Sequence, residues 1–444
     1  MTSLHSLDLL TSTVARHPAV RRIGRICSIT GNTTSVSGLS DIISVGDKVT
    51  FAPLSSVTGE AVSVSASCCR IMVDGKMEGL KIGQPVQFLG KSFLFPHETW
   101  LGRVIDGDGN ALDDGPLICG ATPVSLQSNP PPATKRRALG ERLNTGQALF
   151  NTVLPVVRGQ RVGFFAGSGV GKSSLMAAFA RDMDADVVVI GLIGERGREV
   201  NEFVHRVLGK KGLARSVVVA ATSEQSALAR RRAAFSAVTI AEYFRNHGQH
   251  VLLMMDSVTR LAEAHRELAE AAGESTAMRG FPPSLVPLLA GFAARAGPGA
   301  DGMGDITALF TVLVSGSDMD EPVADTLRGL LDGHVVMSRE IAERGRFAAV
   351  DVLKSVSRSL PDAATPAQNA LISQTRITLS LYEDSEIMIR SGLYQTGSNI
   401  DLDTAVSQFP DLDAFAGNRS EGTFEADFAR LEECLGSKEK ESTP

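Results

Sequence analysis

Hydrophobic and polar positions follow different periods in different parts of the chain. Between residues 21 and 95, apolar and polar residues alternate in short β-branched runs, and turn signals such as "VDGK" separate them. Alternation of this kind is typical of strands that are buried on one face. Several short strands at regular spacing predict a small β-barrel or sandwich. The runs are "RIGRICSI", "TSVSG", "KVTFA", "AVSVSAS", "CRIMV" and "QPVQFL".

From about residue 150 the apolar runs become continuous, and amphipathic helical stretches alternate with them. A strand that is apolar at every position is buried on both faces. We therefore expect an α/β domain with a parallel sheet and helices on either side. The runs are "QRVGFFAG", "DVVVIGLIG", "SVVVAAT", "HVLLMMDS" and "ITALFTVLVSG".

The two ends of the chain carry helical patterns without such strands. "NALISQTRITLSLYED" and "EADFARLEECL" predict helices, and "GSKEKESTP" predicts a disordered tail. Leu4, Leu7, Leu10 and Val14 form a helical stripe that is too short to be stable alone, so it is either a frayed terminus or a helix that docks on a partner. The expected division is a docking helix at 1–20, a β-barrel at 21–95, a nucleotide-binding domain at 96–360 and a helical domain with its tail at 361–444.

Composition narrows the class of protein. The 444 residues include 43% apolar and 21% charged residues, which is ordinary for a globular protein, and the formal net charge is −6. A generally basic surface for nucleic acid is not indicated. The five cysteines show no C-x-x-C spacing, which indicates reduced thiols rather than a disulfide scaffold or a zinc site. No secretory signal and no apolar stretch long enough for a transmembrane helix is visible in the sequence.

The segment "FFAGSGVGKSSL" carries the first candidate chemistry. It approximates the phosphate-binding pattern G-x-x-x-x-G-K-[ST], with Ala166 in place of the first glycine. It follows a predicted strand and opens a predicted helix, so its backbone N–H groups and the helix N-terminus can face phosphates. We expect Lys172 to reach the β- and γ-phosphates and the Ser173 hydroxyl to bind Mg²⁺. The expected nucleotide contacts are Ala166, Gly167, Ser168, Gly169, Val170, Gly171, Lys172, Ser173 and Ser174.

Two carboxylates follow other predicted strands. Asp256 ends "VLLMMD", 84 residues after Lys172, and this position is typical of the Walker B acid that holds Mg²⁺. Glu195 follows "VVVIGLIG", at the sheet edge where ligands bind in α/β folds. Position alone leaves two interpretations of Glu195, a group that polarises water and a helix N-terminal acid that the helix dipole favours.

Six segments together resemble the flagellum-specific ATP synthase family, the export ATPases of the flagellar type III secretion apparatus. This family is related to the injectisome ATPases and to the F-type ATP synthase β subunit. The resemblance implies a β-barrel, a RecA-like P-loop domain and an all-helical C-terminal domain. The segments are "FFAGSGVGKSS", "GLIGERGREVNEF", "VLLMMDSVTRLAEAHRE", "GESTAMRGFPPSLV", "VSGSDMDEPVADTLRGLLDGHVVMSRE" and "VDVLKSVSR".

The resemblance also assigns roles to individual residues. It implies that Glu195 is the catalytic carboxylate, that Arg196 lies near the γ-phosphate, and that Arg358 is an arginine finger given to the neighbouring subunit. Phe347 stands where the family usually has Tyr followed by Pro for adenine stacking, and here Ala348 replaces the proline. Stacking should survive this change, although the loop would be looser. Tyr394 matches a further aromatic near the base, and core packing in the helical domain explains it equally well.

Partners and location follow from the resemblance alone. It implies an ATP- and Mg²⁺-dependent homohexamer in the bacterial cytoplasm, peripheral at the inner-membrane face. The implied partners are a regulator at the N-terminal helix, a stalk protein, the membrane export gate, and exported proteins with their chaperones. No nucleic-acid partner is expected.

Three other functions compete with this interpretation. Injectisome ATPases share the chemistry but often have "GAGCGKT" at the P-loop, whereas this chain has "GSGVGKS". Rotary-synthase catalytic subunits have patterns closer to "GGAGVGKT" and "GERTREG", and the chain departs from both. A hexameric RNA helicase would stack bases on aromatics of its barrel. Residues 21–95 offer only Phe51, Phe88, Phe93 and Phe95 for that purpose.

Overall fold

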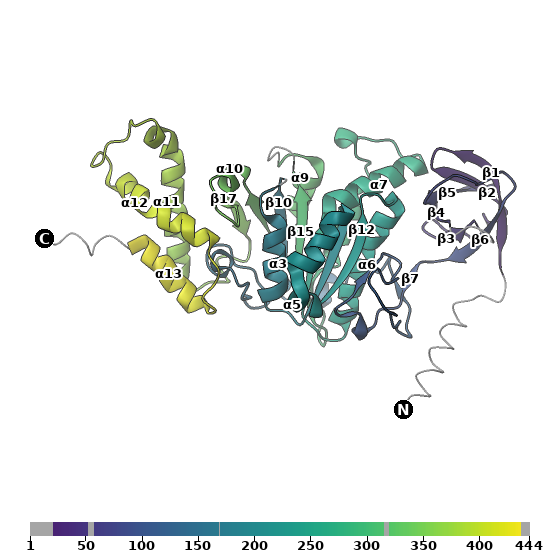
Figure 1. Cartoon of the computed structure of the whole chain (residues 1–444), viewed down its shortest axis with the longest axis horizontal. Helices are drawn as coiled ribbons and strands as arrows, with labels where there is room; N and C mark the ends of the chain where they lie inside the picture. Colours follow the sequence, from purple (N-terminus) through teal and green to yellow (C-terminus); the bar gives the residue numbers. More distant parts are fainter. Residues whose placement is uncertain (1–20, 52–56, 168, 315–318, 437–444) are drawn as a thin grey trace, which may run out of the picture.

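The computed structural model describes residues 21–51, 57–167, 169–314 and 319–436. The molecule is elongated, with a barrel at one end, an α/β domain in the middle and helices at the other end (Figure 1). These three parts confirm the predicted fold class. Among the described residues, no helix has the length and apolar character needed to cross a bilayer.

The N-terminal strands close into an antiparallel barrel in the order β1-β2-β5-β4-β3-β6. Period-two alternation places one face of each strand inside, where Phe51 is fully buried. The Phe51 ring is therefore not available for stacking on a base. The strands are β1 (Ile23–Thr30), β2 (Thr33–Ser37), β3 (Lys48–Thr50), β4 (Thr58–Val64), β5 (Cys69–Asp74) and β6 (Pro85–Gly90).

The central sheet contains all five of the predicted buried strands. Its order is β17-β16-β10-β15-β13-β11-β12-β8, and β14 pairs with β15. The pairings along this order are parallel except for β16 with β17, which is antiparallel like the β14–β15 pair. The strands are β8 (Val104–Ile105), β10 (Arg161–Ala166), β11 (Val187–Glu195), β12 (Ser216–Thr222), β13 (Val251–Asp256), β14 (Gly297–Pro298), β15 (Asp305–Leu313), β16 (Gly333–Met337) and β17 (Val350–Ser357). A separate two-stranded sheet pairs β7 (Phe93–Leu94) with β9 (Val124–Ser125).

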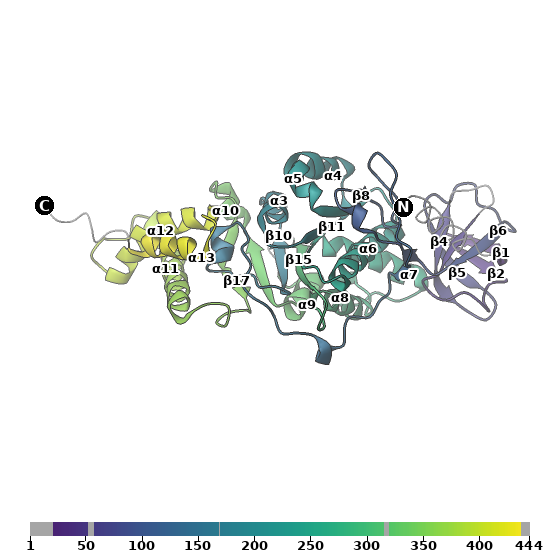
Figure 2. The ribbon, with the colours of Figure 1, turned by 90° about the horizontal axis from the view of Figure 1, so that it is seen from below.

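Helices cover both faces of this sheet, which explains the continuous apolar runs (Figure 2). Along β11, Val188 and Ile190 belong to the core beneath α3, whereas Val187 and Val189 belong to the core beneath α6 and α7. The helices are α2 (Ala148–Asn151), α3 (Lys172–Asp182), α4 (Gly197–Glu202), a π-helix (Phe203–Leu208), α5 (Gly209–Ala214), α6 (Ala227–Asn246), α7 (Val258–Ala272), α8 (Leu285–Ala294), α9 (Pro322–Leu330) and α10 (Arg339–Glu343), with short 3₁₀ turns at Glu98–Trp100, Ala133–Lys135 and Met278–Gly280.

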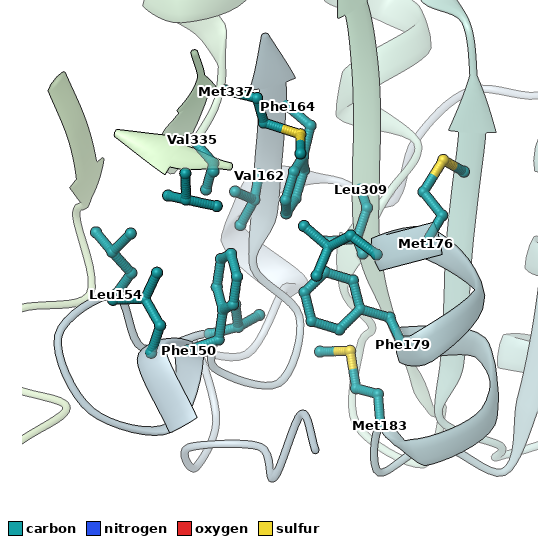
Figure 3. Packing of buried hydrophobic residues seen from close by; sticks show 14 of the residues in the cluster. Phe150, Leu154, Val162, Phe164, Met176, Phe179, Met183, Leu309, Val335 and Met337 are labelled. Atoms are coloured by element: carbon teal, nitrogen blue, oxygen red, sulfur yellow. The ribbon is translucent and has the colours of Figure 1, made fainter. Parts of the chain in front are cut away.

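Aromatic packing fixes α3, and therefore the segment that precedes it. The rings of Phe150, Phe164 and Phe179 lie 5.1–6.0 Å apart between their centroids (Figure 3). Phe164 belongs to β10 and Phe179 to α3, so the strand and the helix on either side of the P-loop share one core. The loop between them is thus held at both ends by buried side chains.

The end domains are joined to the centre by different contacts. Arg232 of α6 is buried and donates to Asp74 of the barrel at 3.0 Å and to Asp108 at 3.1 Å. The basic run at 230–232 is therefore part of an ion-pair network. The C-terminal helices α11 (Pro366–Arg390), α12 (Ile400–Gly417) and α13 (Phe424–Gly436) pack on the α3 side, where Phe415 and Leu431 join the same core. The predicted docking helix at 1–20 and the tail from 437 lie outside the described residues.

Candidate active site

The P-loop connects β10 to α3, and two of its glycines have a positive φ angle. Gly169 has φ 82° and Gly171 has φ 85°, and Gly171 stands at the N-cap of α3. Residues that have a Cβ rarely adopt such positive φ values, and this accounts for glycine at both positions. The first residues of α3 are Lys172, Ser173 and Ser174, so their backbone N–H groups are the free donors of the helix N-terminus. Ser168 lies outside the described residues.

Three predicted site residues converge at the carboxyl edge of the sheet. The Nζ atom of Lys172 lies 2.5 Å from Oδ1 of Asp256 and 4.0 Å from Oε1 of Glu195. Asp256 ends β13 and Glu195 ends β11, two neighbouring parallel strands. Lys172 reaches this pair from the start of α3. The structure therefore brings together a cation and two carboxylates from three separate segments.

A residue that the sequence interpretation missed completes this cluster. Thr311 on β15 donates its hydroxyl to Oδ1 of Asp256 at 2.6 Å. Strand β15 lies between β10 and β13, so its side chains stand between the P-loop strand and Asp256. The sequence signal that could have indicated Thr311 was its polar side chain inside the otherwise apolar stretch of "ITALFTVLVSG".

Burial gives Glu195 an unusual proton affinity. Its pKa is raised to about 7, mainly because burial disfavours the charged form. The neighbouring charge of Asp256 contributes to this rise, and Lys172 opposes it. A carboxyl group with a pKa near neutral pH can accept and return a proton under working conditions, as a general base requires.

A cavity opens beside the cluster. It has a volume of about 270 Å³, and its lining includes Ser173, Ser174, Glu195, Glu199 and Asp256. Another cavity of about 700 Å³ lies beside Ala166 and Gly167, with Arg260, Arg279 and Arg339 on its walls. Both cavities border the P-loop, and together they provide room for a polyphosphate and an attacking water.

The donor groups suit Mg²⁺ only in combination with phosphate. Among the described residues, no group of three His, Cys, Asp or Glu side chains could hold a metal ion alone. The cavity lining includes the Ser173 hydroxyl and the Asp256 carboxylate. Mg²⁺ commonly takes one or two protein oxygens and completes its shell with water and substrate phosphates, so these residues fit that ion.

Other predicted residues lie outside the cluster. Arg196 caps α4, and its side chain is 78% exposed beside Glu199. Arg358 follows β17, is exposed, and donates to the backbone carbonyl of Arg328 at 3.2 Å. Phe347 is 56% exposed but lies near the P-loop, because a Cβ on Gly171 would be 3.0 Å from its ring.

Tyr394 is not brought together with Phe347. Its hydroxyl donates to Asp403, near the start of α12. The other end of α12, at Gly417, is the end that approaches Phe347. Fourteen helical residues separate Asp403 from Gly417, or roughly 20 Å. The geometry within this chain therefore favours a role for Tyr394 in the helical domain rather than at the base.

Comparison with known families agrees with this architecture. The ATP synthase alpha/beta family matches with its nucleotide-binding domain at residues 146–357 and its beta-barrel domain at residues 19–90. The T3SS EscN ATPase C-terminal domain matches residues 364–433.

Individual relatives cover nearly the whole chain. The flagellum-specific ATP synthase of Caulobacter vibrioides is 41% identical, covering 97% of this chain and 99% of the relative. The type 3 secretion system ATPase of Pseudomonas syringae pv. tomato is 40% identical, covering 92% of each. The assembled ATPase EscN of the enteropathogenic E. coli type III secretion system has a TM-score of 0.86 and 33% identity, covering 93% of this chain and 100% of EscN. EscN has also been solved in complex with its central stalk EscO, with a TM-score of 0.84, 33% identity, and coverage of 93% of this chain and 100% of EscN.

These matches extend over all three parts of the fold and confirm the family that the sequence motifs indicated. The chain belongs to the family of flagellum-specific ATP synthases and type III secretion ATPases.

Proposed function

We propose that the protein is an ATPase that energises protein export through a flagellar type III secretion apparatus. The observation that carries this proposal is the convergence of Lys172, Glu195 and Asp256 beside the P-loop. These residues supply a phosphate-binding cation, a proton acceptor and a metal-binding carboxylate. Together they match the requirements of phosphoryl transfer to water.

The chain's own groups bind and orient the nucleotide. The N–H groups of the P-loop and of α3 face the phosphates, and Lys172 leaves Asp256 to contact the β- and γ-phosphates. Ser173 and Asp256 would hold Mg²⁺, which neutralises charge on the phosphates when bound. Glu195 accepts a proton from the attacking water. Water oxygen bonds to the γ-phosphorus, the bond to the bridging β–γ oxygen breaks, and ADP and phosphate are released.

Glu195→Gln tests the role of the proton acceptor. The amide keeps the size of the side chain but cannot take up the proton, so we expect hydrolysis to slow by ~10²–10⁴-fold while ATP still binds. Single-turnover hydrolysis and equilibrium ATP binding measure the two properties. Glu202→Gln is a matched control, because Glu202 lines the same cavity from α4. Loss of ATP binding in Glu195→Gln, with hydrolysis per bound ATP unchanged, would instead show a structural role.

The pKa of Glu195 predicts a pH dependence. Above its pKa of about 7 the carboxylate is ionised and can accept a proton, and below this value it is protonated. We therefore expect kcat/KM to fall about tenfold for each pH unit well below 7, since kcat/KM reports the free enzyme. Initial rates between about pH 5 and pH 8 measure this profile. A wild-type profile without this acidic limb, or the same limb in Glu195→Gln, would contradict the assignment.

Assembly into a ring is the second part of the proposal. The related EscN has been solved as an assembled ATPase and with a central stalk. By analogy, this chain forms a homohexamer with a stalk partner, and Arg358 completes the site of a neighbouring subunit. Arg196 would approach the γ-phosphate only after its exposed side chain turns towards the P-loop.

The flagellar machine is favoured over the injectisome by the P-loop sequence "GSGVGKS". Overall identity does not separate the two, since flagellum-specific ATP synthases match at 40–42% and a type 3 secretion system ATPase matches at 40%. Replacing the chromosomal gene by its Glu195→Gln version separates them, because loss of flagellar filaments supports the flagellar assignment and loss of injectisome secretion supports the other.

The remaining partners follow from the proposed machine. They are a regulator at residues 1–20, the membrane export gate, and exported proteins with their chaperones. The proposed location is the cytoplasmic face of the inner membrane, and no nucleic-acid partner is proposed.

A further inference from the structure

We propose that Arg346 is a positioning residue for the adenine base, because it ties the loop that carries Phe347 to helix α12. The inference rests on the proposed function, in which Phe347 stacks on the base. It adds the residues that hold the Phe347 ring in place. Arg346 and its partner Asp413 were not among the predicted site residues.

The Phe347 ring lies against the P-loop. A Cβ on Gly171 would be 3.0 Å from Cδ1 of the ring and 3.6 Å from Cε1. The side chain is nevertheless 56% exposed. One edge of the ring therefore touches the turn that precedes Lys172, while much of its surface is open to a flat ligand. Bases stack on such aromatic surfaces whatever their hydrogen-bonding pattern.

The Arg346 side chain holds the segment between α10 and β17 by hydrogen bonds to backbone carbonyls of that segment. Its guanidinium donates to the backbone carbonyl of Val350 at 2.8 Å and, more weakly, to that of Ala348 at 3.4 Å. These acceptors lie one and three residues beyond Phe347, so the Arg346 side chain spans the backbone of the stacking residue. Ala348 leaves φ free where a proline would fix it, and the guanidinium supplies a restraint of a different kind.

The same guanidinium reaches the helical domain. Its Nε atom lies 2.9 Å from Oδ1 of Asp413 on α12, and the Arg346 side chain is only 10% exposed. The contact is an ion pair rather than an aligned hydrogen bond, since the Nε–H has no hydrogen-bond acceptor. Burial lowers the pKa of Arg346, and the charge of Asp413 opposes this shift. Asp413 therefore offsets part of the cost of burying the guanidinium.

Helix α12 also touches the loop directly. A Cβ on Gly417 would lie 3.0 Å from the carbonyl oxygen of Phe347 and 3.4 Å from Cγ of Arg346. Asp413 and Gly417 are four residues apart, and therefore on the same face of α12. The loop is thus enclosed by the P-loop on one side and by this face of α12 on the other.

The test separates base binding from phosphate binding. Equilibrium binding of ATP and of inorganic tripolyphosphate, both with Mg²⁺, is measured for the wild type, Arg346→Ala, Phe347→Ala and the double variant. We expect Arg346→Ala to weaken ATP binding by about tenfold, within the usual range for loss of a stacked base, and to leave tripolyphosphate binding unchanged. The double variant should bind ATP no more weakly than Phe347→Ala, since both substitutions remove the same contact.

Two further variants supply controls. Arg344→Ala removes an ion pair that also joins this region to the helical domain, through Glu386 at 3.3 Å, but Arg344 has no bond across Phe347. It should leave both affinities unchanged. Asp413→Asn should reproduce part of the Arg346→Ala loss, because it removes the charge on α12 but not the bonds to the loop carbonyls.

Each outcome identifies which part of the account fails. If Phe347→Ala weakens ATP binding and Arg346→Ala does not, the positioning role is wrong and the stacking role stands. Equal loss of ATP and tripolyphosphate in Arg346→Ala shows general damage to the fold and also overturns the proposal. If Phe347→Ala leaves ATP binding unchanged, base stacking fails and the positioning role fails with it, while the hydrolytic assignment of Glu195 is unaffected.

Discussion

Lys172→Ala will leave a folded chain without measurable ATP hydrolysis. Lys172 is the cation at the P-loop, and its Nζ atom is the group that offsets the charges of Asp256 and Glu195. Removing it takes away the positive charge from the β- and γ-phosphates. It also leaves the Asp256 carboxylate facing the cavity without its cation, which opposes entry of a polyanion.

The variant is expected to fold because Glu195 can become neutral. Uncompensated buried charges usually cost several kcal/mol of stability. The pKa of Glu195 is already about 7, and loss of the nearby cation raises it further, so the side chain takes up a proton at neutral pH. Turnover and a thermal melt are measured on the same sample. A folded Lys172→Ala chain with near-normal turnover contradicts the assignment of the P-loop.

Arg358→Ala is expected to reduce turnover by ~10³–10⁵-fold, the usual range for loss of an arginine finger. We propose that Arg358 serves another subunit's site. Ser357 pairs with Gly333 at the start of β16, whereas Ala166, just before the P-loop, pairs with Met337 at its end. Four strand residues separate these positions, or about 13 Å. With β16 also between β17 and β10, an arginine side chain does not reach its own P-loop.

A purely structural role for Arg358 predicts a different result. Among the described residues it forms no ion pair, and its guanidinium bonds to the carbonyl of Arg328. Such an exposed hydrogen bond contributes about 1 kcal/mol or less to stability. If this bond were its only role, the alanine variant would hydrolyse ATP at nearly the wild-type rate. Steady-state turnover of purified, assembled protein distinguishes these outcomes.

The strands of the central sheet were predictable because each is buried on both faces. Runs such as "VVVIGLIG" and "VLLMM" are apolar throughout, and turns or helices bound them. The position of Asp256 and Glu195 at the ends of such runs placed both at one sheet edge. Their contact with Lys172 was not predictable, since it depends on the strand order β10-β15-β13-β11.

Helix α12 shows where the sequence patterns were insufficient. It has Pro410 in its interior and no pronounced apolar stripe, so its sequence does not stand out as a helix. Its contacts with α11 and α2 stabilise it regardless. Asp413 and Gly417 lie on this helix, and therefore their approach to the Phe347 loop could not be inferred. Strand β16 and the edge strand β17 were also missed, although they set the position of Arg358.

The proposed active site is shared between neighbouring subunits of a ring. The most direct test of this proposal mixes two inactive variants of the chain. Lys172→Ala chains keep Arg358, and Arg358→Ala chains keep an intact P-loop. In mixed hexamers, an Arg358→Ala site beside a Lys172→Ala neighbour receives the finger that it lacks. ATP hydrolysis should therefore recover in part when the two are assembled together, and assembly of mixed rings is verified with differently tagged chains. Recovery is the predicted result, and its absence in demonstrably mixed hexamers contradicts the account.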